Sequence, residues 1–554
     1  MKKVNWIYVA IIGLLLVGTI GLFKLRLDLT AEKRYTLSDN TENIIKSVKA
    51  PLMIDVYLDG DFPASFKQLQ GETRFMLEEF RRINPNVDFR FIDPIKNKIP
   101  EDSLMAMGMM PSALPEAKNG KVTQTIIYPY AVLNYKDYLL SFPLLVNKAG
   151  VSISDQLNQS IEGLEYNFVS GIKSVLTENS KTVGFLTNHD ELKPDELQYF
   201  TQVVLQNYNA TFIVPANEKE LTTQDLPNLK KVDALVVAKP RKAFTEGEKV
   251  ILDQYIMNGG RTLWMMEAVN AEMDSITRSK QITSYPVDAN MSDFFFNYGV
   301  RINPVLVKDL QKFALLRLVT GEINGNPQFM SLPWPYYPLG IAENPNPITK
   351  NINPVKFDFP SSIDTLGGKP GIKTNVLFES SPRTIVKRTP SLVDLKEIAT
   401  VDSLAMLEQP STPKIFAVSL EGKFSSAYAN RSESKEFPGF ISKNTKPNKM
   451  VVIADGDIAR NKFVKGRPMP IGNDMLTDQQ FGNEQFLTNI LEYLLDDSNL
   501  IELRNRNIES RLLDTQLINE ERGKWQMINL VLPLVIIAIL GGIFFYLRKR
   551  RFAK

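Results

Sequence analysis

The only histidine of the chain stands in an acidic triplet, His189, Asp190 and Glu191. The triplet follows a short apolar run that ends near Thr187 and reads as a buried β-strand. Ligands of α/β sheets bind at the carboxyl ends of strands, so this position favours a binding site. The alternative interpretation is a hydrogen-bonded loop, since exposed acidic residues commonly begin helices and no second histidine is present to share a metal ion.

A second pair of carboxylates, Asp455 and Asp457, flanks Gly456 after another apolar run. Carboxylate oxygens are the ligands that hard cations prefer. Two carboxylates alone rarely form a cation site, so a solvated turn is the simpler interpretation. The candidate ligand-binding residues are therefore these two aspartates together with the His189 triplet. We predict no catalytic residue, no metal ion and no cofactor.

Residue types and spacing exclude several catalytic chemistries. The chain has no cysteine, which excludes thiol nucleophiles, disulfides and thiolate metal sites. The segment from Gly367 to Thr374 comes nearest to a phosphate-binding loop, but Ile372 separates Gly371 from Lys373 and breaks the required Gly-Lys register. No Gly-x-Ser-x-Gly motif accompanies the histidine, so a hydrolase ranks last. We expect no enzyme, and any ATP hydrolysis would belong to another subunit.

The elements that would position these residues alternate between strands and helices. In chain order we expect a helix over Ser154–Leu176, a strand over Thr182–Leu186, a helix over Pro194–Gln206, a strand over Ala234–Ala238, a helix over Glu246–Met257, strands over Arg261–Met266, Phe416–Val418 and Met450–Ala454, and a helix over Asn483–Leu495. Such alternation predicts a doubly wound α/β sheet.

One stretch interrupts this pattern. Pro327 to Pro360 holds eight of the 33 prolines. Because proline lacks a backbone donor and fixes φ, we expect a long non-regular insertion here. An ordinary packed loop is favoured over a partner-docking surface.

The region before the large domain has a pattern of its own. We expect a helix over Asp39–Val48 capped by Ser38, a strand over Leu52–Leu58, a helix over Ala64–Ile83, a strand over Val87–Ile92, and a hairpin of Thr123–Leu133 with Tyr138–Val146. A strand-helix-strand unit followed by a hairpin resembles a thioredoxin-like layout. Without cysteine, that fold can serve only as a scaffold.

Two uncharged runs are long enough to cross a bilayer as helices, Val4 to Phe23 and Met527 to Leu547. The residues after Phe23 offer no signal-peptide cleavage site, so the first run reads as an uncleaved anchor. Two spans place both termini on one side. The basic cluster from Arg548 to Arg551 marks that side as cytoplasmic, which puts the bulk of the chain in the periplasm.

Charge also bears on partners. The chain has 65 basic and 62 acidic residues, but all the acidic ones lie between the two runs, whereas seven of the basic ones lie in the tails. The body is therefore slightly acidic. Nucleic-acid binders usually carry a concentrated basic face, so no nucleic-acid partner is expected.

Several segments resemble the gliding-motility ABC transporter auxiliary proteins of Bacteroidetes. The resemblance begins with Arg26–Thr30 and Glu32–Ser38 beside the first run. Asn188–Leu192 is similar to the family's Gly-His-Gly-Glu loop, with Asn188 and Asp190 where glycines would stand. Further similar segments are Lys239–Pro240, Tyr255–Arg261, Asp455–Asn461 and Asn483–Asn489. The resemblance extends over essentially the whole chain.

This resemblance implies a membrane-anchored subunit of the bacterial inner membrane, often labelled substrate-binding, that works in gliding motility. Its implied partners are a separate ABC ATPase, a multispan ABC-2-type permease and other gliding or envelope components. The central region is similar to the GIFT domain, which is akin to amidotransferase sheets. Those enzymes need a cysteine nucleophile that this chain lacks.

The expected organisation is an anchor (1–24), a thioredoxin-like domain (25–150), a GIFT-like α/β domain with the proline-rich insertion (151–500), a juxtamembrane segment (501–526), a transmembrane helix (527–547) and a basic tail (548–554). The leading hypothesis is a non-enzymatic auxiliary subunit. The alternative is a solute-capturing receptor with a cleft between its two α/β domains.

Overall fold

The structure is a computed structural model that describes residues 36–60, 62, 64–118, 121–146, 151–176, 181–323, 326–342, 345–367, 369–401, 410–474, 477, 479–498, 500–505 and 515–552. The chain is mixed α/β. The described residues from Thr36 to Asn505 form one compact unit, and the C-terminal helix belongs to a second.

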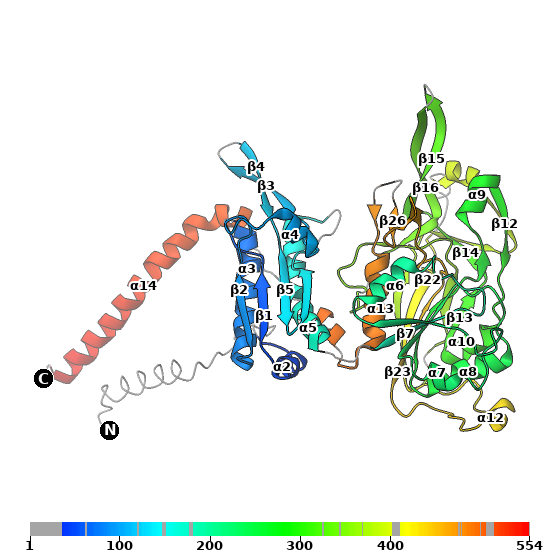
Figure 1. The fold of residues 1–554 in the computed structure, drawn as a ribbon. Coiled ribbons are helices and arrows are strands. Elements are labelled where there is room, and N and C mark those ends of the chain that lie inside the picture. Colours follow the sequence, from blue (N-terminus) through cyan, green and yellow to red (C-terminus); the bar gives the residue numbers. More distant parts are fainter. Residues whose placement is uncertain are drawn as a thin grey trace. The chain divides into compact units, whose positions relative to one another are not determined.

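The first part of the compact unit is built on a four-stranded sheet in the order β2-β1-β5-β6 (Figure 1). Its elements are α2 (Asp39–Lys46), β1 (Leu52–Val56), α3 (Ala64–Ile83), β2 (Val87–Phe91), α4 (Glu101–Ala106), β5 (Tyr130–Tyr135), β6 (Tyr138–Pro143) and α5 (Ile153–Leu176). β1 and β2 run parallel with α3 between them, whereas β5 and β6 form an antiparallel hairpin. The predicted strand-helix-strand unit is confirmed.

Two helices supply most of the apolar surface that covers this sheet. Phe80 of α3 and Phe168 of α5 are fully buried in one core with Ile54 and Leu133 of the strands. Burial of each such side chain contributes roughly 1.5–3 kcal/mol to folding. The predicted cap is also confirmed, because the Ser38 side chain accepts a hydrogen bond from the first turn of α2.

The predicted hairpin is wrong in its first half. Thr123–Leu133 is not one strand, because β4 (Lys121–Ile127) ends before Pro129 and β5 begins after it. Proline cannot donate a ladder hydrogen bond, which accounts for the break. β4 instead pairs with β3 (Ser112–Lys118) in a separate hairpin.

A nine-stranded sheet forms the centre of the larger part, in the order β13-β18-β22-β23-β10-β9-β7-β8, with β19 also paired to β22. Its parallel strands are β8 (Asn209–Ile213), β7 (Thr182–Leu186), β9 (Ala234–Ala238), β10 (Arg261–Met265) and β23 (Asn448–Ile453). Antiparallel strands extend it, namely β22 (Ile415–Gly422), β19 (Ile372–Glu379), β18 (Ser362–Thr365) and β13 (Val300–Asn303). The strands predicted over 182–186 and 234–238 have those bounds.

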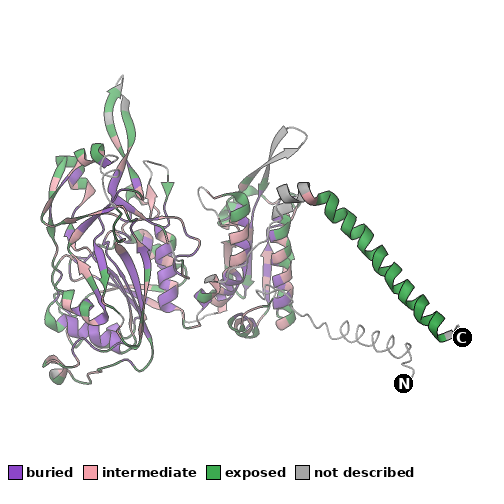
Figure 2. Cartoon of the chain, turned by 180° about the vertical axis from the view of Figure 1, so that it is seen from behind, coloured by how far each residue is buried: buried purple, intermediate pink, exposed green. Residues whose placement is uncertain are grey.

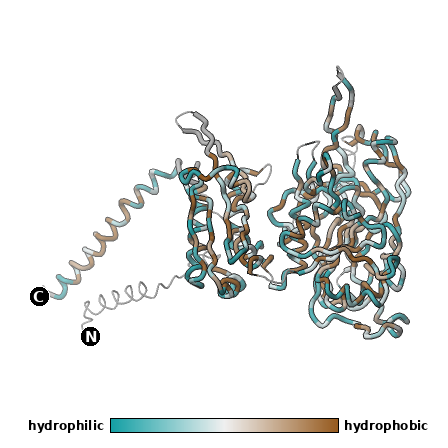
Figure 3. The backbone as a smooth tube through the Cα atoms, viewed as in Figure 1, coloured by the Kyte–Doolittle hydropathy of each residue, from teal (hydrophilic) through white to brown (hydrophobic). Residues whose placement is uncertain are grey.

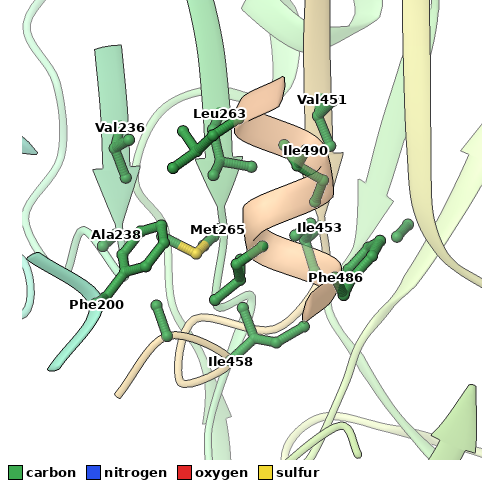
Figure 4. Close-up of a cluster of buried hydrophobic side chains, with 14 of the residues drawn as sticks. Phe200, Val236, Ala238, Leu263, Met265, Val451, Ile453, Ile458, Phe486 and Ile490 are labelled. Atoms are coloured by element: carbon green, nitrogen blue, oxygen red, sulfur yellow. The ribbon is translucent and has the colours of Figure 1, made fainter. Parts of the chain in front are cut away.

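Helices cover both faces of this sheet. α6 (Gln198–Leu205) and α13 (Asn483–Leu495) pack on one face, and α8 (Glu246–Met257) and α10 (Ser292–Tyr298) on the other. Side chains alternate accordingly, since Leu263 lies in the first core and its neighbour Trp264 in the second. Figure 4 shows the first core around α13, and the central strands β7, β9, β10 and β23 are buried along almost their whole length (Figure 2). Burial on both faces explains why these strands read as continuous apolar runs.

Short elements complete the unit around these two sheets. They are α7 (Leu226–Leu229), β11 (Val269–Asn270), α9 (Met273–Ser279), β12 (Gln281–Pro286), β14 (Val305–Asp309), β17 (Val355–Lys356), β20 (Thr384–Arg388), β21 (Ser391–Asp394), η1 (Leu395–Thr400), α12 (Glu433–Glu436), β24 (Phe463–Val464), β25 (Arg467–Pro468), β26 (Asn473–Asp474), β27 (Gln479–Gln480) and η2 (Leu500–Asn505). Most pair in two- or three-stranded sheets.

The expectation of a non-regular proline-rich insertion is wrong for its first half. β16 (Asn326–Gly340) is a long strand that pairs with β15 (Phe313–Ile323) and forms the hairpin that projects at the top of Figure 1. The pairing carries two register shifts, and the one between Phe313 and Leu315 lies opposite the stretch from Pro333 to Pro338, where prolines cannot donate to the ladder. Trp334 and Tyr336 alternate into a buried aromatic cluster, which holds the strand in place.

The second unit contains α14 (Thr515–Phe552), whose segment Glu521–Arg551 is long and apolar enough to cross a membrane. Figure 3 shows its apolar middle between hydrophilic ends. This helix includes the predicted second span, Met527 to Leu547, and is consistent with a membrane anchor. The predicted first span, Val4 to Phe23, lies outside the described residues.

Candidate functional site

The carboxyl edge of the parallel strands carries both predicted candidate loops. From β7 the chain moves to β8 on one side and then to β9 on the other, so the strand order reverses between β7 and β9. Ligands of doubly wound sheets bind at such a switch point. His189 follows β7, and Lys239 follows β9 directly. We call this region the carboxyl edge.

The side chain of His189 lies between the carboxylate of Glu248 and the ring of Phe244. Its Nε2 lies 3.0 Å from Oε2 of Glu248, and its ring stacks on Phe244 with 3.6 Å between the ring centroids. Only 3% of His189 is exposed. The backbone N–H groups of Arg241 and Lys242 both donate to its carbonyl oxygen. The side chain and backbone of this loop are therefore fixed by the residues after β9.

Glu248 is the anchor of this loop. It occupies the third position of α8 in a capping box with Thr245. Its carboxylate accepts five hydrogen bonds, from Asn188, His189, the Leu221 backbone, and the backbone and hydroxyl of Thr245. Burial opposes ionisation, but these hydrogen bonds outweigh it and lower the pKa of Glu248 to about 2.

The rest of the triplet divides into a buried and an exposed residue. Oε2 of Glu191 accepts a hydrogen bond of 2.6 Å from the His189 backbone N–H. Its Oε1 lies 3.7 Å from Nδ1 of His189, and neither atom has a hydrogen-bond partner among the described residues. Burial raises the pKa of Glu191. Asp190 is exposed with φ of 56°, a left-handed conformation typical of glycine.

Lys239 forms the second buried cluster of the carboxyl edge. It is 2% exposed, and its Nζ lies 2.8 Å from Glu267, 2.5 Å from Asp457 and 3.3 Å from Glu272. Burial disfavours the ammonium charge, but Glu267 and Asp457 outweigh it and raise the pKa of Lys239. Glu267 follows β10 and Asp457 follows β23. Together with β7 and β9, four strands therefore contribute residues to the carboxyl edge.

The Asp455 turn fits tightly around this lysine. Asp455 is buried, and it accepts backbone hydrogen bonds of 2.8 Å from Asp358 and Asp457. Burial, followed by the neighbouring Asp358 and Asp457, raises its pKa. A Cβ on Gly456 would lie 2.7 Å from Cγ of Lys239, so only glycine fits between the two aspartates. Beside them lies a cavity of about 50 Å³, far smaller than the roughly 300–1,000 Å³ of typical solute pockets.

The structure therefore brings Asp457 to the same edge as the histidine loop, with Lys239 and Arg241 between them. Arg241 reaches the Asp190 carbonyl oxygen at 3.5 Å and Glu272 at 3.7 Å. Sequence reasoning did not select Lys239, Glu248 or Glu267 as site residues. A lysine directly after an all-apolar strand was the available signal, because a buried cation requires buried acids.

This arrangement suits a structural role better than a reaction. The ammonium group of Lys239 and Nε2 of His189 each face carboxylates of the same chain, and such pairing favours a structural role. Nδ1 of His189 and Oε1 of Glu191 are buried polar atoms of this loop that keep no hydrogen-bond partner among the described residues. Among the described residues, no group of three or more acidic or histidine side chains has the geometry of a metal site. The carboxyl edge joins the loops after β7, β9, β10 and β23.

Two larger cavities lie elsewhere, along β6. One has about 460 Å³ and is lined by Tyr138, Leu139 and Leu140 of β6. The other has about 410 Å³ and is lined by Phe142 and Pro143. Both are within the size range of binding pockets.

Comparisons with known proteins place this geometry in context. Residues 180–490 match a family described as ABC-type uncharacterized transport system, and residues 31–134 match a domain of unknown function, DUF7088. An uncharacterized protein of Borreliella burgdorferi is 22% identical over 549 residues, which cover 96% of this chain and 95% of that protein. Among solved structures, the mmIFT52 N-terminal domain is similar over 57% of this chain and 99% of that chain, with 13% identity and a TM-score of 0.33. A TM-score of this size supports no argument about fold or function.

The family match begins just before β7 and ends within α13, so it contains the whole parallel sheet and the carboxyl edge. It spans more than half of the 554 residues. The chain therefore belongs to the family of auxiliary proteins of ABC-type uncharacterized transport systems.

Proposed function

We propose that this chain is a non-enzymatic auxiliary subunit that joins an ABC ATPase and a multispan ABC-2-type permease in one membrane complex. The observation that carries this proposal is the family match over residues 180–490. The carboxyl edge supports the non-enzymatic part, since Lys239 and His189 are held by acids of the same chain. No step of ATP hydrolysis is assigned to these residues.

Co-purification tests this proposal. The full chain, purified by an affinity tag from its native membranes in mild detergent, is expected to bring with it one ABC ATPase and one multispan permease. His189→Gln is a suitable control, because the glutamine amide can still donate to Glu248 and the proposal gives His189 no part in the association. Absence of both subunits from the purified material would overturn the proposal.

We further propose that the chain crosses the inner membrane twice, with both termini cytoplasmic and the body in the periplasm. The apolar helix α14 supports the second crossing, and the basic cluster after it supports the orientation. The absence of cysteine provides a clean test. Lys219→Cys in the body is expected to react with a membrane-impermeant maleimide in intact cells, whereas Lys554→Cys is expected to react only after lysis. The reverse pattern would contradict this topology.

The biological process that we propose is gliding motility, together with other envelope components. The resemblance of the Arg26–Ser38 segment and the later motifs to gliding auxiliary proteins supports it. Deletion of the coding sequence should stop gliding while growth continues. Complementation with His189→Gln should restore movement, and a deletion strain that still glides would exclude this role.

At the level of domains, we propose a thioredoxin-like first domain and a GIFT-like second domain. The order β2-β1-β5-β6 with a parallel first pair supports the former, and the parallel order β8-β7-β9-β10-β23 supports the latter. The apolar face of α5 packs into the core of the small sheet. We therefore propose that the first domain continues to Leu176, beyond the boundary at residue 150 that composition suggests.

The second candidate function is solute capture. The cavity of about 460 Å³ beside β6 is the observation in its favour. Thermal-shift screening of the full chain in detergent against sugars, amino acids and nucleosides tests it. A specific solute that raises the melting temperature would favour capture, and Tyr166→Ala in the cavity wall should abolish that shift.

A further inference from the structure

β6 is an open edge of the small sheet. It lies at the end of the order β2-β1-β5-β6. Tyr135 and Tyr138 flank the two-residue turn between β5 and β6. In an antiparallel pair, the backbone N–H and C=O groups of every second residue point toward the partner strand. The hydrogen bond from Leu144 N to Pro129 O shows that the even-numbered residues of β6 point toward β5. Leu139 and Ser141 consequently point their backbone N–H and C=O groups away from β5.

The composition of this edge contrasts with that of the opposite one. β6 contains no charged residue, and Tyr138 and Leu139 are 59% and 60% exposed. At the other edge, β2 carries Asp88 and Arg90, which form ion pairs with Arg81 and Asp55. Charged side chains are a common protection of edge strands against added strands. β2 has this protection and β6 lacks it.

The two larger cavities follow the open edge of β6. Leu139 and Leu140 both line the first cavity, although consecutive side chains of a strand point to opposite faces. Phe142 and Pro143 line the second in the same way. Each cavity must therefore reach around the edge. Both also share Tyr166, Ser170 and Glu492, so they adjoin one another. We call these two adjoining cavities the β6 groove.

The charged side chains that line the β6 groove are all paired with groups of this chain. Lys173 Nζ lies 2.7 Å from Asp496, and the Tyr166 hydroxyl donates to Glu492. Apolar side chains such as Leu139 and Leu495 complete the lining together with uncharged polar ones, among them Gln206 and Asn207. An occupant with a net charge would find no unpaired countercharge among these groups.

We propose that the β6 groove binds an uncharged, apolar, extended segment of a partner polypeptide, which adds to β6 as a further strand. Such a segment supplies backbone donors and acceptors at the spacing of Leu139 and Ser141. The groove follows the chain from Tyr138 to Val146, which is about 30 Å at roughly 3.3 Å per residue. A compact solute fills one cavity and leaves the edge amides unpaired. This inference does not depend on the proposed transport partners.

The test is site-specific photo-crosslinking in the full chain in native membranes. A benzophenone amino acid at position 139 is expected to give an adduct to one contiguous apolar stretch of a polypeptide, mapped by mass spectrometry. The same amino acid at Tyr285, which is 56% exposed on β12, serves as the control position. An adduct to a lipid or a small solute, or no adduct, would overturn the proposal.

Ser141 supplies the matched pair of variants. Its hydroxyl donates to the Met107 carbonyl oxygen, and both Ser141→Ala and Ser141→Pro lose that bond. Only the proline variant also loses the outward N–H. We expect the adduct yield to be retained in Ser141→Ala and to fall at least about tenfold in Ser141→Pro, as for the loss of one buried hydrogen bond. Equal yields in the two variants would contradict strand addition.

A folding control keeps this test decisive. The two variants should melt at the same temperature, because the Ser141 N–H makes no bond to β5. If the proline variant melts at a lower temperature than the alanine variant, amide hydrogen exchange of the unsubstituted chain is measured instead of the adduct yield. The amides of Leu139 and Ser141 are then expected to exchange slowly in native membranes and quickly in the purified chain. Fast exchange in both preparations would overturn the proposal.

Discussion

The carboxyl edge of the large sheet and the open edge of β6 use polar groups in opposite ways. At the carboxyl edge, Lys239 and His189 are buried and each faces acids of the same chain. Along β6, the backbone groups of Leu139 and Ser141 point away from β5, and the side chains of Tyr138 and Leu139 are exposed. In the first region the charged groups are paired within the chain, whereas in the second the outward backbone groups of an edge strand have no partner strand in the part of the chain that the structure describes.

The difference indicates where stability and where association reside. Removing one partner of a buried ion pair leaves an uncompensated charge and costs roughly 3–5 kcal/mol. Substitution of an exposed side chain away from such an ion pair typically changes the free energy of unfolding by less than about 0.5 kcal/mol. Removing a charge from an ion pair of the carboxyl edge should therefore destabilise the chain strongly, whereas substitutions along β6 should leave it folded but alter what it binds.

The largest effect is expected from Lys239→Met. Methionine keeps the apolar stem but removes the charge that faces Glu267, Asp457 and Glu272. We expect the free energy of unfolding to fall by about 3–5 kcal/mol, measured by denaturant titration of the full chain in detergent. Lys242→Met, at a nearby exposed lysine, is the control and should change it by less than about 0.5 kcal/mol. Similar values for both variants would show that the Lys239 cluster is not a structural anchor.

The second-largest effect is expected from Glu248→Gln. Glutamine has the same shape as glutamate, but its amide N–H₂ would face groups that are themselves hydrogen-bond donors. The cost at neutral pH should be about 3 kcal/mol, since five hydrogen bonds converge on this side chain. At low pH the difference in unfolding free energy between the wild type and Glu248→Gln should disappear. The pKa of Glu248 is lowered from 4.5 to about 2, so its stabilisation is complete above pH 4.5 and is lost as the pH falls toward 2.

The unfolding free energies of the wild type and Glu248→Gln should therefore converge between pH 4.5 and pH 2. Thr245→Val, which removes the hydroxyl but keeps the carboxylate, serves as the comparison and should retain most of the acid sensitivity. Parallel curves for the wild type and Glu248→Gln would show that this carboxylate does not anchor the loop.

A smaller effect is expected from Gly456→Ala. The new Cβ would lie 2.7 Å from Cγ of Lys239 and 3.1 Å from Cβ of Glu267. Overpacking costs roughly 1–3 kcal/mol, and we expect about 2 kcal/mol because Cβ of Lys239, 2.8 Å from the new atom, can move only with its backbone. Gly71→Ala in α3 is the control, since nothing lies within 4 Å of its Cβ, and alanine there should stabilise the helix slightly. If both changes were neutral, the carboxyl edge would be looser than its distances indicate.

Much of the fold followed from local pattern. β7, β9, α3, α8 and α13 have the bounds that their apolar runs and capping signals predict. β16 did not follow, because the prolines of its sequence argue against a strand when it is considered alone. Its partner β15 and the burial of Trp334 decide the outcome, and both depend on contacts across the chain.

The site was less accessible to sequence reasoning. His189, Glu191 and Asp457 were found because they follow apolar runs, and strand ends can be located from sequence. Glu248 and Glu267 escaped selection, since their importance comes from the groups that the fold turns toward them. The open edge of β6 was likewise hidden, because which strand ends a sheet is a property of topology.

The smallest effect on stability is expected from Leu139→Lys, which gives β6 the kind of charge that β2 carries at Arg90. Leu139 is 60% exposed, so the free energy of unfolding should change by less than about 0.5 kcal/mol. Light scattering of the purified chain should nevertheless show less self-association, because a lysine on an edge opposes the addition of strands. Tyr285→Lys, at a similarly exposed position of β12, should leave self-association unchanged. A loss of more than about 1 kcal/mol would assign Leu139 to the core, and the contrast between the two edges would then fail.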